Sequence, residues 1–217
     1  MIKSFFVFIA LFLSNCSNSN SKYEYLEKDD SFREKIKSGD FVELSHGFTY
    51  FEKNNLNNDE IVVFIHGFSV PSYIWDETYY ESVERGLGVI RLDLYGRGNS
   101  SNPDTTYNDL LYANQVIELL DYLNIDKKVS LVGLSSGGRV ISTIAYLYPE
   151  RVKRLVYVAP GGFHDKKTAP DSRPVLQSDV DTFIEKNYST IAKGQMSDFK
   201  YPERFNGWRK NIAHVPQ

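Results

Sequence analysis

The sequence predicts an α/β fold in which a mostly parallel sheet carries helices on both faces. Short apolar runs alternate along the chain with longer segments whose apolar residues recur at helical spacing. This alternation is typical of parallel strands joined by right-handed helical crossovers. The apolar run over residues 61–65 has the composition of a strand buried on both faces. With 217 residues, the chain is long enough for one such domain.

The composition is that of an ordinary globular protein, with 41% hydrophobic and 24% charged residues. A net charge of −3 gives no sign of a surface that binds nucleic acid. We therefore expect no nucleic-acid partner, and we make no prediction of the oligomeric state.

The N-terminus has the pattern of an export signal. After Lys3, residues 5–13 form an apolar run that is too short to span a bilayer as a helix, which predicts a signal peptide over residues 1–15. The following Cys16 is the only cysteine, so no disulfide within the chain is possible. Residues 13–16, Leu-Ser-Asn-Cys, resemble a bacterial lipobox, which implies a lipoprotein anchored to the membrane through Cys16. The alternative is an ordinary secretory signal and a secreted or periplasmic protein.

The first half of the domain begins after a polar tether and surface segment, which we place at residues 16–39. Residues 41–44 and 48–51 predict two strands of an opening hairpin. Residues 73–85 have helical spacing and end at Gly86, a residue that commonly stops a helix.

The second half continues the alternation. Residues 89–93 predict a strand that runs into a glycine-rich loop, and residues 107–123 predict an amphipathic helix. A strand at 129–132, a helix at 137–148 and a strand at 152–159 follow. We place the folded core at residues 40–162. After it, the sequence is polar and poorly periodic, with one possible helix at 180–187.

The junction between the strand at 129–132 and the next helix carries the pattern most directly linked to chemistry. Residues 133–137, Gly-Leu-Ser-Ser-Gly, match the G-x-S-x-G pattern of a nucleophile elbow. In so tight a turn, Gly133 and Gly137 allow the close backbone approach, and Ser135 is expected in a strained conformation. A phosphate-binding turn is the alternative, although the lysine of a P-loop and the GxGxxG spacing are both missing.

Four motifs follow one another along residues 41–162. They are His66-Gly67-Phe68, the loop at 93–100 (Asp-Leu-Tyr-Gly-Arg-Gly-Asn-Ser), the elbow at 133–137 and the stretch at 148–152 (Tyr-Pro-Glu-Arg-Val). In order and spacing, they resemble the α/β-hydrolase fold family.

The resemblance implies the roles of individual residues. Ser135 would be the nucleophile, and the backbone N–H groups of Phe68 and Ser136 would stabilise the oxyanion. His66 would hold the loop that presents the Phe68 amide, and it is not expected to act as a base. The elbow and loop glycines would be Gly67, Gly133 and Gly137, and the architecture of the second loop would rest on Asp93, Arg97 and Gly98. Phe68, Tyr73 and Trp75 are candidates either for the wall of an acyl pocket or for plain packing.

The acid and the histidine of the family's triad follow the serine in chain order. The candidates are Asp165 as the acid and His214 as the base. His164, the other histidine after Ser135, is adjacent to Asp165 and could not readily lie between it and the serine. The usual segments for both residues, and for the last strands of the sheet, do not occur before Gln217. We therefore expect the C-terminal part of the sheet to be missing, residues 163–217 to form part of a cap or lid, and the chain to be truncated.

The expected function is that of a serine hydrolase of the esterase or lipase type, acting on a small-molecule carboxylic ester without cofactor or metal. A serine rather than an aspartate at the elbow argues against dehalogenase and epoxide hydrolase chemistry, while C–C hydrolase, peroxidase and acyltransferase variants stay open. One alternative is a catalytically inactive, truncated lipoprotein of the same fold with a binding role or none. Another is an α/β domain that binds phosphate or a nucleotide.

Overall fold

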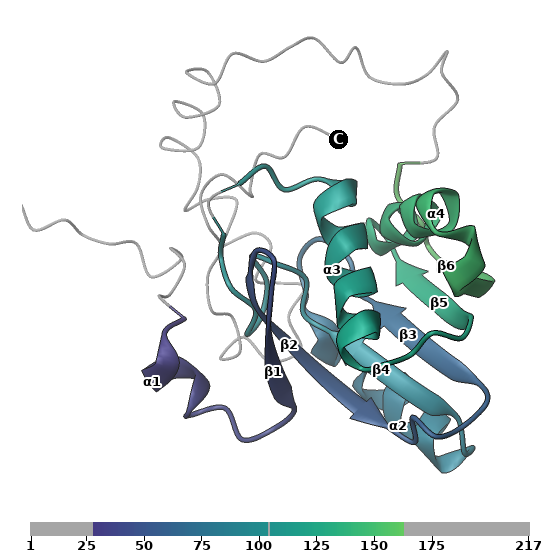
Figure 1. Cartoon of the computed structure of the whole chain (residues 1–217), viewed down its shortest axis with the longest axis horizontal. Helices are drawn as coiled ribbons and strands as arrows, with labels where there is room; N and C mark the ends of the chain where they lie inside the picture. The colour runs from purple at the N-terminus through teal and green to yellow at the C-terminus, as the bar shows by residue number, and fades with distance from the viewer. Residues whose placement is uncertain (1–27, 104, 163–217) are drawn as a thin grey trace, which may run out of the picture.

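A computed structural model describes residues 28–103 and 105–162 and arranges them as a six-stranded sheet with helices on both faces (Figure 1). The elements, including the short 3-10 helices η1 and η2, are α1 (Asp30–Arg33), β1 (Asp40–Leu44), β2 (Gly47–Asn54), β3 (Ile61–Ile65), η1 (Ser72–Trp75), α2 (Asp76–Glu84), β4 (Gly88–Leu92), α3 (Asp109–Tyr122), β5 (Val129–Leu134), α4 (Gly137–Leu147), η2 (Pro149–Arg151) and β6 (Val152–Val158).

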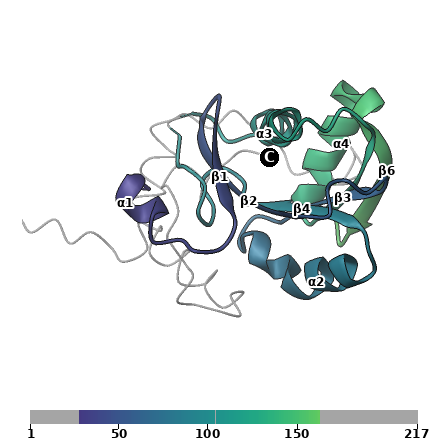
Figure 2. The ribbon, with the colours of Figure 1, turned by 60° about the horizontal axis from the view of Figure 1, so that its bottom comes forward.

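The sheet has the strand order β1-β2-β4-β3-β5-β6. The pairs β3/β4, β3/β5 and β5/β6 are parallel, whereas β1 and β2 form an antiparallel hairpin, and β2 also runs antiparallel to β4. Helix α2 covers one face, and α3 and α4 cover the other (Figure 2). The predicted α/β fold with a mostly parallel sheet is therefore confirmed.

The centre of the sheet is buried on both faces, as the apolar run at 61–65 predicts. Val63 and Ile65 pack into the core beneath α3 and α4, whereas Phe64 packs with Trp75 on the face covered by α2. Successive side chains of a strand point to opposite faces, so a strand between two helical layers has apolar residues on both faces.

Helix α3 begins two residues later than the spacing predicts. The side chain of Asn108 accepts a hydrogen bond from the backbone N–H of Leu111 at 2.8 Å. This N-cap satisfies a donor that the first turn cannot satisfy itself, so the helix starts at Asp109. Its end is set by Asn124, whose φ of 54° lies in the left-handed region.

The predicted signal peptide, the possible helix at 180–187 and the cap region lie outside the described residues. Within residues 28–103 and 105–162, no helix is both long and apolar enough to cross a membrane.

Candidate active site

Ser135 stands at the apex of the turn between β5 and α4. Its φ is 52°, a left-handed conformation that non-glycine residues rarely adopt. The N–H of Ser135 donates to the carbonyl oxygen of Val158 at 3.0 Å, and the carbonyl oxygen of Ser135 accepts from the N–H groups of Gly138 and Gly161, both at 2.9 Å. Hydrogen bonds to the helix and to the end of β6 therefore stabilise the strained residue.

The turn closes because two positions have no side chain. A Cβ at Gly133 would lie 2.5 Å from the carbonyl oxygen of Gly137, and a Cβ at Gly137 would lie 2.6 Å from the carbonyl oxygens of Ile65 and His66. Both distances are far below van der Waals contact. These close approaches to neighbouring backbone explain the glycine at each end of the motif.

Ser135 precedes the N-terminus of α4, where the backbone carries partial positive charge. Ser136, the N-cap residue, makes no side-chain capping hydrogen bond. In the part of the chain that the structure describes, the Ser135 hydroxyl makes no hydrogen bond. The geometry favours the accumulation of negative charge beside Ser135.

The loop after β3 lies directly against the elbow. A Cβ at Gly67 would be 3.2 Å from the Cβ of Ser135 and 3.8 Å from its Oγ. The sequence-predicted oxyanion residue Phe68 follows Gly67, so the structure brings the HG-x loop and the predicted nucleophile together.

His66 holds this loop through both of its ring nitrogens. Nε2 accepts a hydrogen bond from the N–H of Leu94 at 2.9 Å, and Nδ1 lies 2.7 Å from the carbonyl oxygen of Gly67. Because a carbonyl can only accept, Nδ1 carries the hydrogen and the ring is neutral. Burial lowers the pKa of His66 to about 4. His66 is therefore a neutral, structural residue, and because both ring nitrogens are hydrogen-bonded, neither is left to take a proton from Ser135.

The loop after β4 is built around the buried Asp93. Its two carboxylate oxygens accept from the N–H groups of Ser72 and Asn99, each at 2.8 Å. Gly98 has a φ of 48°, and a Cβ there would collide with the Asp93 carboxylate. Arg97 donates from Nε to the carbonyl oxygen of Phe68, with its guanidinium 4.5 Å above the Phe68 ring. These contacts join the two loops on either side of the elbow.

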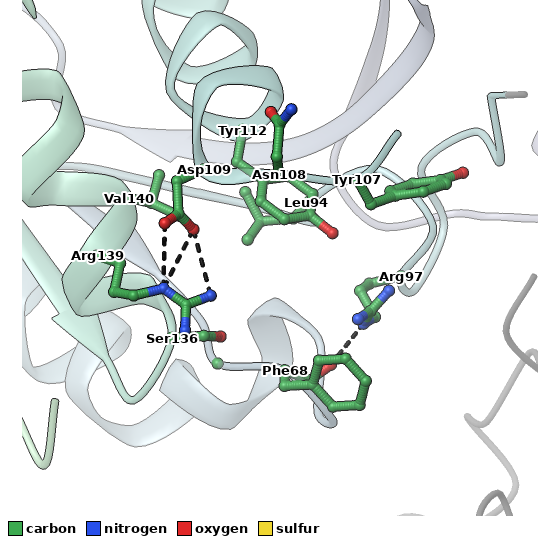
Figure 3. A pocket seen from close by; sticks show the side chains of 11 residues that line it. Phe68, Leu94, Arg97, Tyr107, Asn108, Asp109, Tyr112, Ser136, Arg139 and Val140 are labelled. Atoms are coloured by element: carbon green, nitrogen blue, oxygen red, sulfur yellow. Dashed lines mark hydrogen bonds and ion pairs between the residues drawn. The ribbon is translucent and has the colours of Figure 1, made fainter. Parts of the chain in front are cut away.

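A cavity of about 80 Å³ opens beside these loops (Figure 3). Its lining comes from Gly67, Phe68, Leu94, Arg97, Tyr107, Asn108, Asp109, Tyr112, Ser136, Arg139 and Val140. Figure 3 shows Asp109 facing Arg139, whose Nε is 3.1 Å from the Asp109 carboxylate, and Arg97 against Phe68. The cavity thus combines aromatic walls with guanidinium groups, and its lining includes Phe68 and Ser136.

Residues 60–216 match the family model described as alpha/beta hydrolase fold. The chain belongs to the α/β-hydrolase fold family. The match covers more than half of the chain, and the elbow, the HG-x loop and the buried Asp93 loop described above all lie within it.

The chain is also similar in sequence to individual proteins. The α/β-hydrolase is 34% identical over 185 residues to cis-3-alkyl-4-alkyloxetan-2-one decarboxylase of Shewanella oneidensis, covering 73% of this chain and 55% of the relative. It is 38% identical over 101 residues to an uncharacterized protein of Mycobacterium bovis, covering 46% of this chain and 29% of that protein. The chain therefore spans about half or less of the length of these two relatives.

Solved structures show the same fold. An esterase from Exiguobacterium antarcticum superposes with a TM-score of 0.60 at 20% identity, covering 81% of this chain and 70% of the esterase. A probable hydrolytic enzyme from Pseudomonas aeruginosa gives a TM-score of 0.61 at 23% identity, covering 82% and 59%.

Of the three candidates for the pocket wall, only Phe68 lines this cavity. Trp75 instead packs against Phe64, with ring centroids 5.2 Å apart, on the face covered by α2. Tyr73 lines a separate cavity of about 300 Å³ that also borders Asp93. Of the two roles that the sequence allowed for Trp75, the structure therefore supports packing.

Sequence reasoning did not anticipate the contribution of Asp109, Tyr112 and Arg139. Asp109 begins α3, and Arg139 lies in the first turn of α4. A usable signal existed, because helices that follow parallel strands have their N-termini at the carboxyl edge of the sheet, where ligands bind. Polar residues in those first turns were therefore candidates.

Asp165, His214 and Cys16 lie outside the described residues, so the acid, the base and the lipid anchor stay predictions of the sequence. Within residues 28–103 and 105–162, the histidines are His66 and His46. His46 is exposed in the β1–β2 turn with its ring 6.2 Å from that of Tyr95, and three strands separate β1 from β5. The same residues contain no cluster of three or more metal-ligating side chains.

Proposed function

We propose that this α/β-hydrolase is a serine hydrolase that acts on small carboxylic esters, with Ser135 as its nucleophile. The observation that carries the proposal is the conformation of Ser135, a left-handed residue at the N-terminus of α4. Strained backbone persists only where the surrounding structure enforces it, and it is concentrated at functional sites.

In the proposed reaction, the Oγ of Ser135 attacks the acyl carbonyl carbon, and the π electrons of the carbonyl bond move to its oxygen. The N–H groups of Phe68 and Ser136 would bind this oxyanion. A base takes the hydroxyl proton of Ser135 during the attack. When the intermediate collapses, the bond to the alcohol breaks and the base returns this proton to the leaving alcohol oxygen. Water then hydrolyses the acyl-serine by the same route.

The role of His66 supports the oxyanion assignment. Its Nδ1 binds the carbonyl oxygen of Gly67, which belongs to the same peptide group as the N–H of Phe68. Because that peptide is trans, its N–H points away from its carbonyl. Fixing the Gly67 carbonyl thus fixes the direction of the Phe68 N–H.

The proton of Ser135 needs a base, for which the sequence offers His214 with Asp165 as its acid. Without a base, the hydroxyl is a weak nucleophile, and the protein would bind esters without turning them over. This alternative is favoured by one observation: in the described residues, His66 is fully engaged and His46 lies in the turn between β1 and β2, on the far side of the sheet from β5.

The relatives' names are compatible with ester chemistry. An oxetan-2-one, named in the decarboxylase of Shewanella oneidensis, is itself a cyclic ester, and the structural neighbour from Exiguobacterium antarcticum is an esterase.

The test uses the full chain with a fluorophosphonate probe and with p-nitrophenyl acetate. We expect the probe to label Ser135, and Ser135→Ala to lower turnover on the order of 1,000-fold by removing the nucleophile. Ser142→Ala is the matched control, because Ser142 is on α4 with its hydroxyl bonded to Gly138 and Tyr157. If Ser135 stays unlabelled and turnover equals that of Ser135→Ala, the enzymatic proposal fails and binding remains.

A further inference from the structure

Lys28, at the start of the described structure, is a buried lysine in an otherwise exposed segment. Its side chain lies under the loop after β4, and the residue is only 9% exposed. Nζ donates to the carbonyl oxygen of Ser100 at 2.6 Å and lies 3.2 Å from the side-chain oxygen of Asn102. Burying an amino group is costly unless it is well hydrogen-bonded, and these two oxygen atoms supply the hydrogen-bond acceptors that the buried Nζ needs.

The backbone of Lys28 is held as well. Arg33 donates from Nη1 to the carbonyl oxygen of Lys28 at 2.7 Å. The guanidinium of Arg33 lies 3.6 Å above the ring of Phe48, on strand β2. The segment is therefore attached to the core at two points, by Arg33 to the hairpin and by Lys28 to the loop.

The loop at 93–103, to which Lys28 is hydrogen-bonded, also extends to the candidate site. Ser100 is completely buried, and its hydroxyl donates to the carbonyl oxygen of Asp93 at 2.6 Å while accepting from the N–H of Tyr50 at 2.9 Å. Three residues earlier in this loop, the carbonyl oxygen of Arg97 accepts from the N–H of Ser100 at 3.2 Å, while the Arg97 side chain binds the carbonyl of Phe68 and lines the cavity. A continuous path of hydrogen bonds thus connects Lys28 to Phe68.

We propose that Lys28 is a positioning residue, which fastens the segment before the domain onto the loop at 93–103 and thereby holds Arg97 and Phe68 in place at the site. The proposal rests on the proposed function for its catalytic consequence, because the Phe68 amide is assigned there to the oxyanion. Its structural part, a clasp between Lys28 and the loop, stands on the contacts alone.

The clasp has a pH dependence of defined sign. Burial lowers the pKa of Lys28 from 10.5 to about 7, opposed by the nearby charge of Asp93 and assisted by that of Arg97. The docked lysine binds its proton more weakly than the released lysine. Docking is therefore tightest at alkaline pH, weakens as the pH falls from about 10 to 7, and is constant below that.

Two measurements on the full chain test the clasp itself. Competitive acetylation across pH 6 to 11 should show that Lys28 titrates near neutrality and reacts more slowly than Lys127, whose exposed Nζ also donates to a backbone carbonyl. The protection factors of the amide hydrogens of residues 93–102 should fall about tenfold or more in the wild type when the pH is lowered from 9 to 7.

The variant Lys28→Met keeps the apolar stem and removes the donor. We expect it to reduce the protection of the loop about tenfold at pH 9, the effect of one buried hydrogen bond, and to abolish the pH dependence. The rate at which the probe labels Ser135 in Lys28→Met, divided by the rate in the wild type, should fall as the pH rises from about 7 to 10. Lys127→Met should match the wild type in every measurement.

The outcomes separate the two proposals. If Ser135 is never labelled but Lys28 and the loop behave as expected, the proposed function fails and the clasp stands. If Lys28 acetylates like Lys127, or if the loop of Lys28→Met keeps the wild-type pH dependence, the clasp is wrong. If the loop responds but the labelling ratio stays constant with pH, Lys28 does not position the site.

Discussion

Single side chains at this site act mainly by fixing backbone groups. His66 spends both ring nitrogens on main-chain atoms of Gly67 and Leu94, and Asp93 spends both carboxylate oxygens on backbone N–H groups. Each polar side chain is buried at little cost because it and the buried backbone groups satisfy each other's hydrogen bonds. Histidine and aspartate, the residue types most often associated with catalysis, here hold the loops around the serine.

His66 makes stability depend on pH in the acid range. Its pKa is lowered from 6.5 to about 4, so its contribution is complete above pH 6.5 and is lost as the pH falls to 4. We expect this loss to reach about 3 kcal/mol. Urea unfolding at pH 7, 5 and 4 measures it.

The control for that measurement is His66→Gln, whose amide can also donate to one carbonyl and accept from one N–H but does not titrate. Parallel curves of unfolding free energy against pH for the two proteins would contradict the assignment to His66.

At the scale of secondary-structure elements, the elbow consists of a strand, the single residue Ser135 and a helix. They pack so closely that no side chain fits at Gly133 or Gly137, the two ends of the motif. The local sequence predicts its position, because the apolar strand, the two glycines and the amphipathic helix are contiguous. The loops on either side depend instead on contacts between elements, such as Arg97 with Phe68.

Glycines near the elbow should differ sharply in their tolerance of a methyl group. Gly133→Ala places Cβ 2.5 Å from a backbone oxygen, whereas a Cβ at Gly161 meets nothing closer than 3.7 Å. We expect Gly133→Ala to lower the free energy of unfolding by about 3 kcal/mol through overpacking. Gly161→Ala should change it by less than about 1 kcal/mol. Thermal and urea unfolding compare the two variants, and equal losses would refute this account.

At the scale of the whole molecule, the two sides of the sheet end differently. The β1–β2 hairpin closes one side. On the other, β6 is the last strand of the described sheet, and Val156, Tyr157 and Val158 are exposed, Val156 by 46%. An apolar strand with one edge unpaired within the described residues is a site for association with other chains.

Self-association should therefore depend on the character of β6. Val156→Lys adds a charge to the strand, and we expect it to reduce concentration-dependent light scattering. Tyr146→Lys removes an even more exposed apolar side chain from α4, away from the strand edge, and serves as the control. If both variants reduce scattering equally, general surface hydrophobicity rather than the edge is responsible.

Most of the fold could be predicted because its signals are local. The run at 61–65, the helical spacing at 107–123 and the elbow at 133–137 each lie within one stretch of chain. The exact start of α3 was missed, because the cap formed by Asn108 depends on a single side chain rather than on periodicity.

The candidate site was predicted only in part. The loop that carries Gly67 does lie against Ser135, whereas the roles of Ser135 and Phe68 stay predictions. Lys28 was not foreseen, since its contact with Ser100 spans 72 positions of the chain and leaves no periodic trace in the sequence.

The sequence by itself determined the order of strands and helices and the position of the elbow, because short-range sterics and hydrophobic periodicity decide both. Only the tertiary structure decided which distant groups share the site. The strand order places β4 beside β3 and β3 beside β5, which brings Arg97, Asp109 and Arg139 to one cavity. The physical reason is that such neighbours are set by the packing of whole layers, a property of the folded chain that no short stretch of sequence contains.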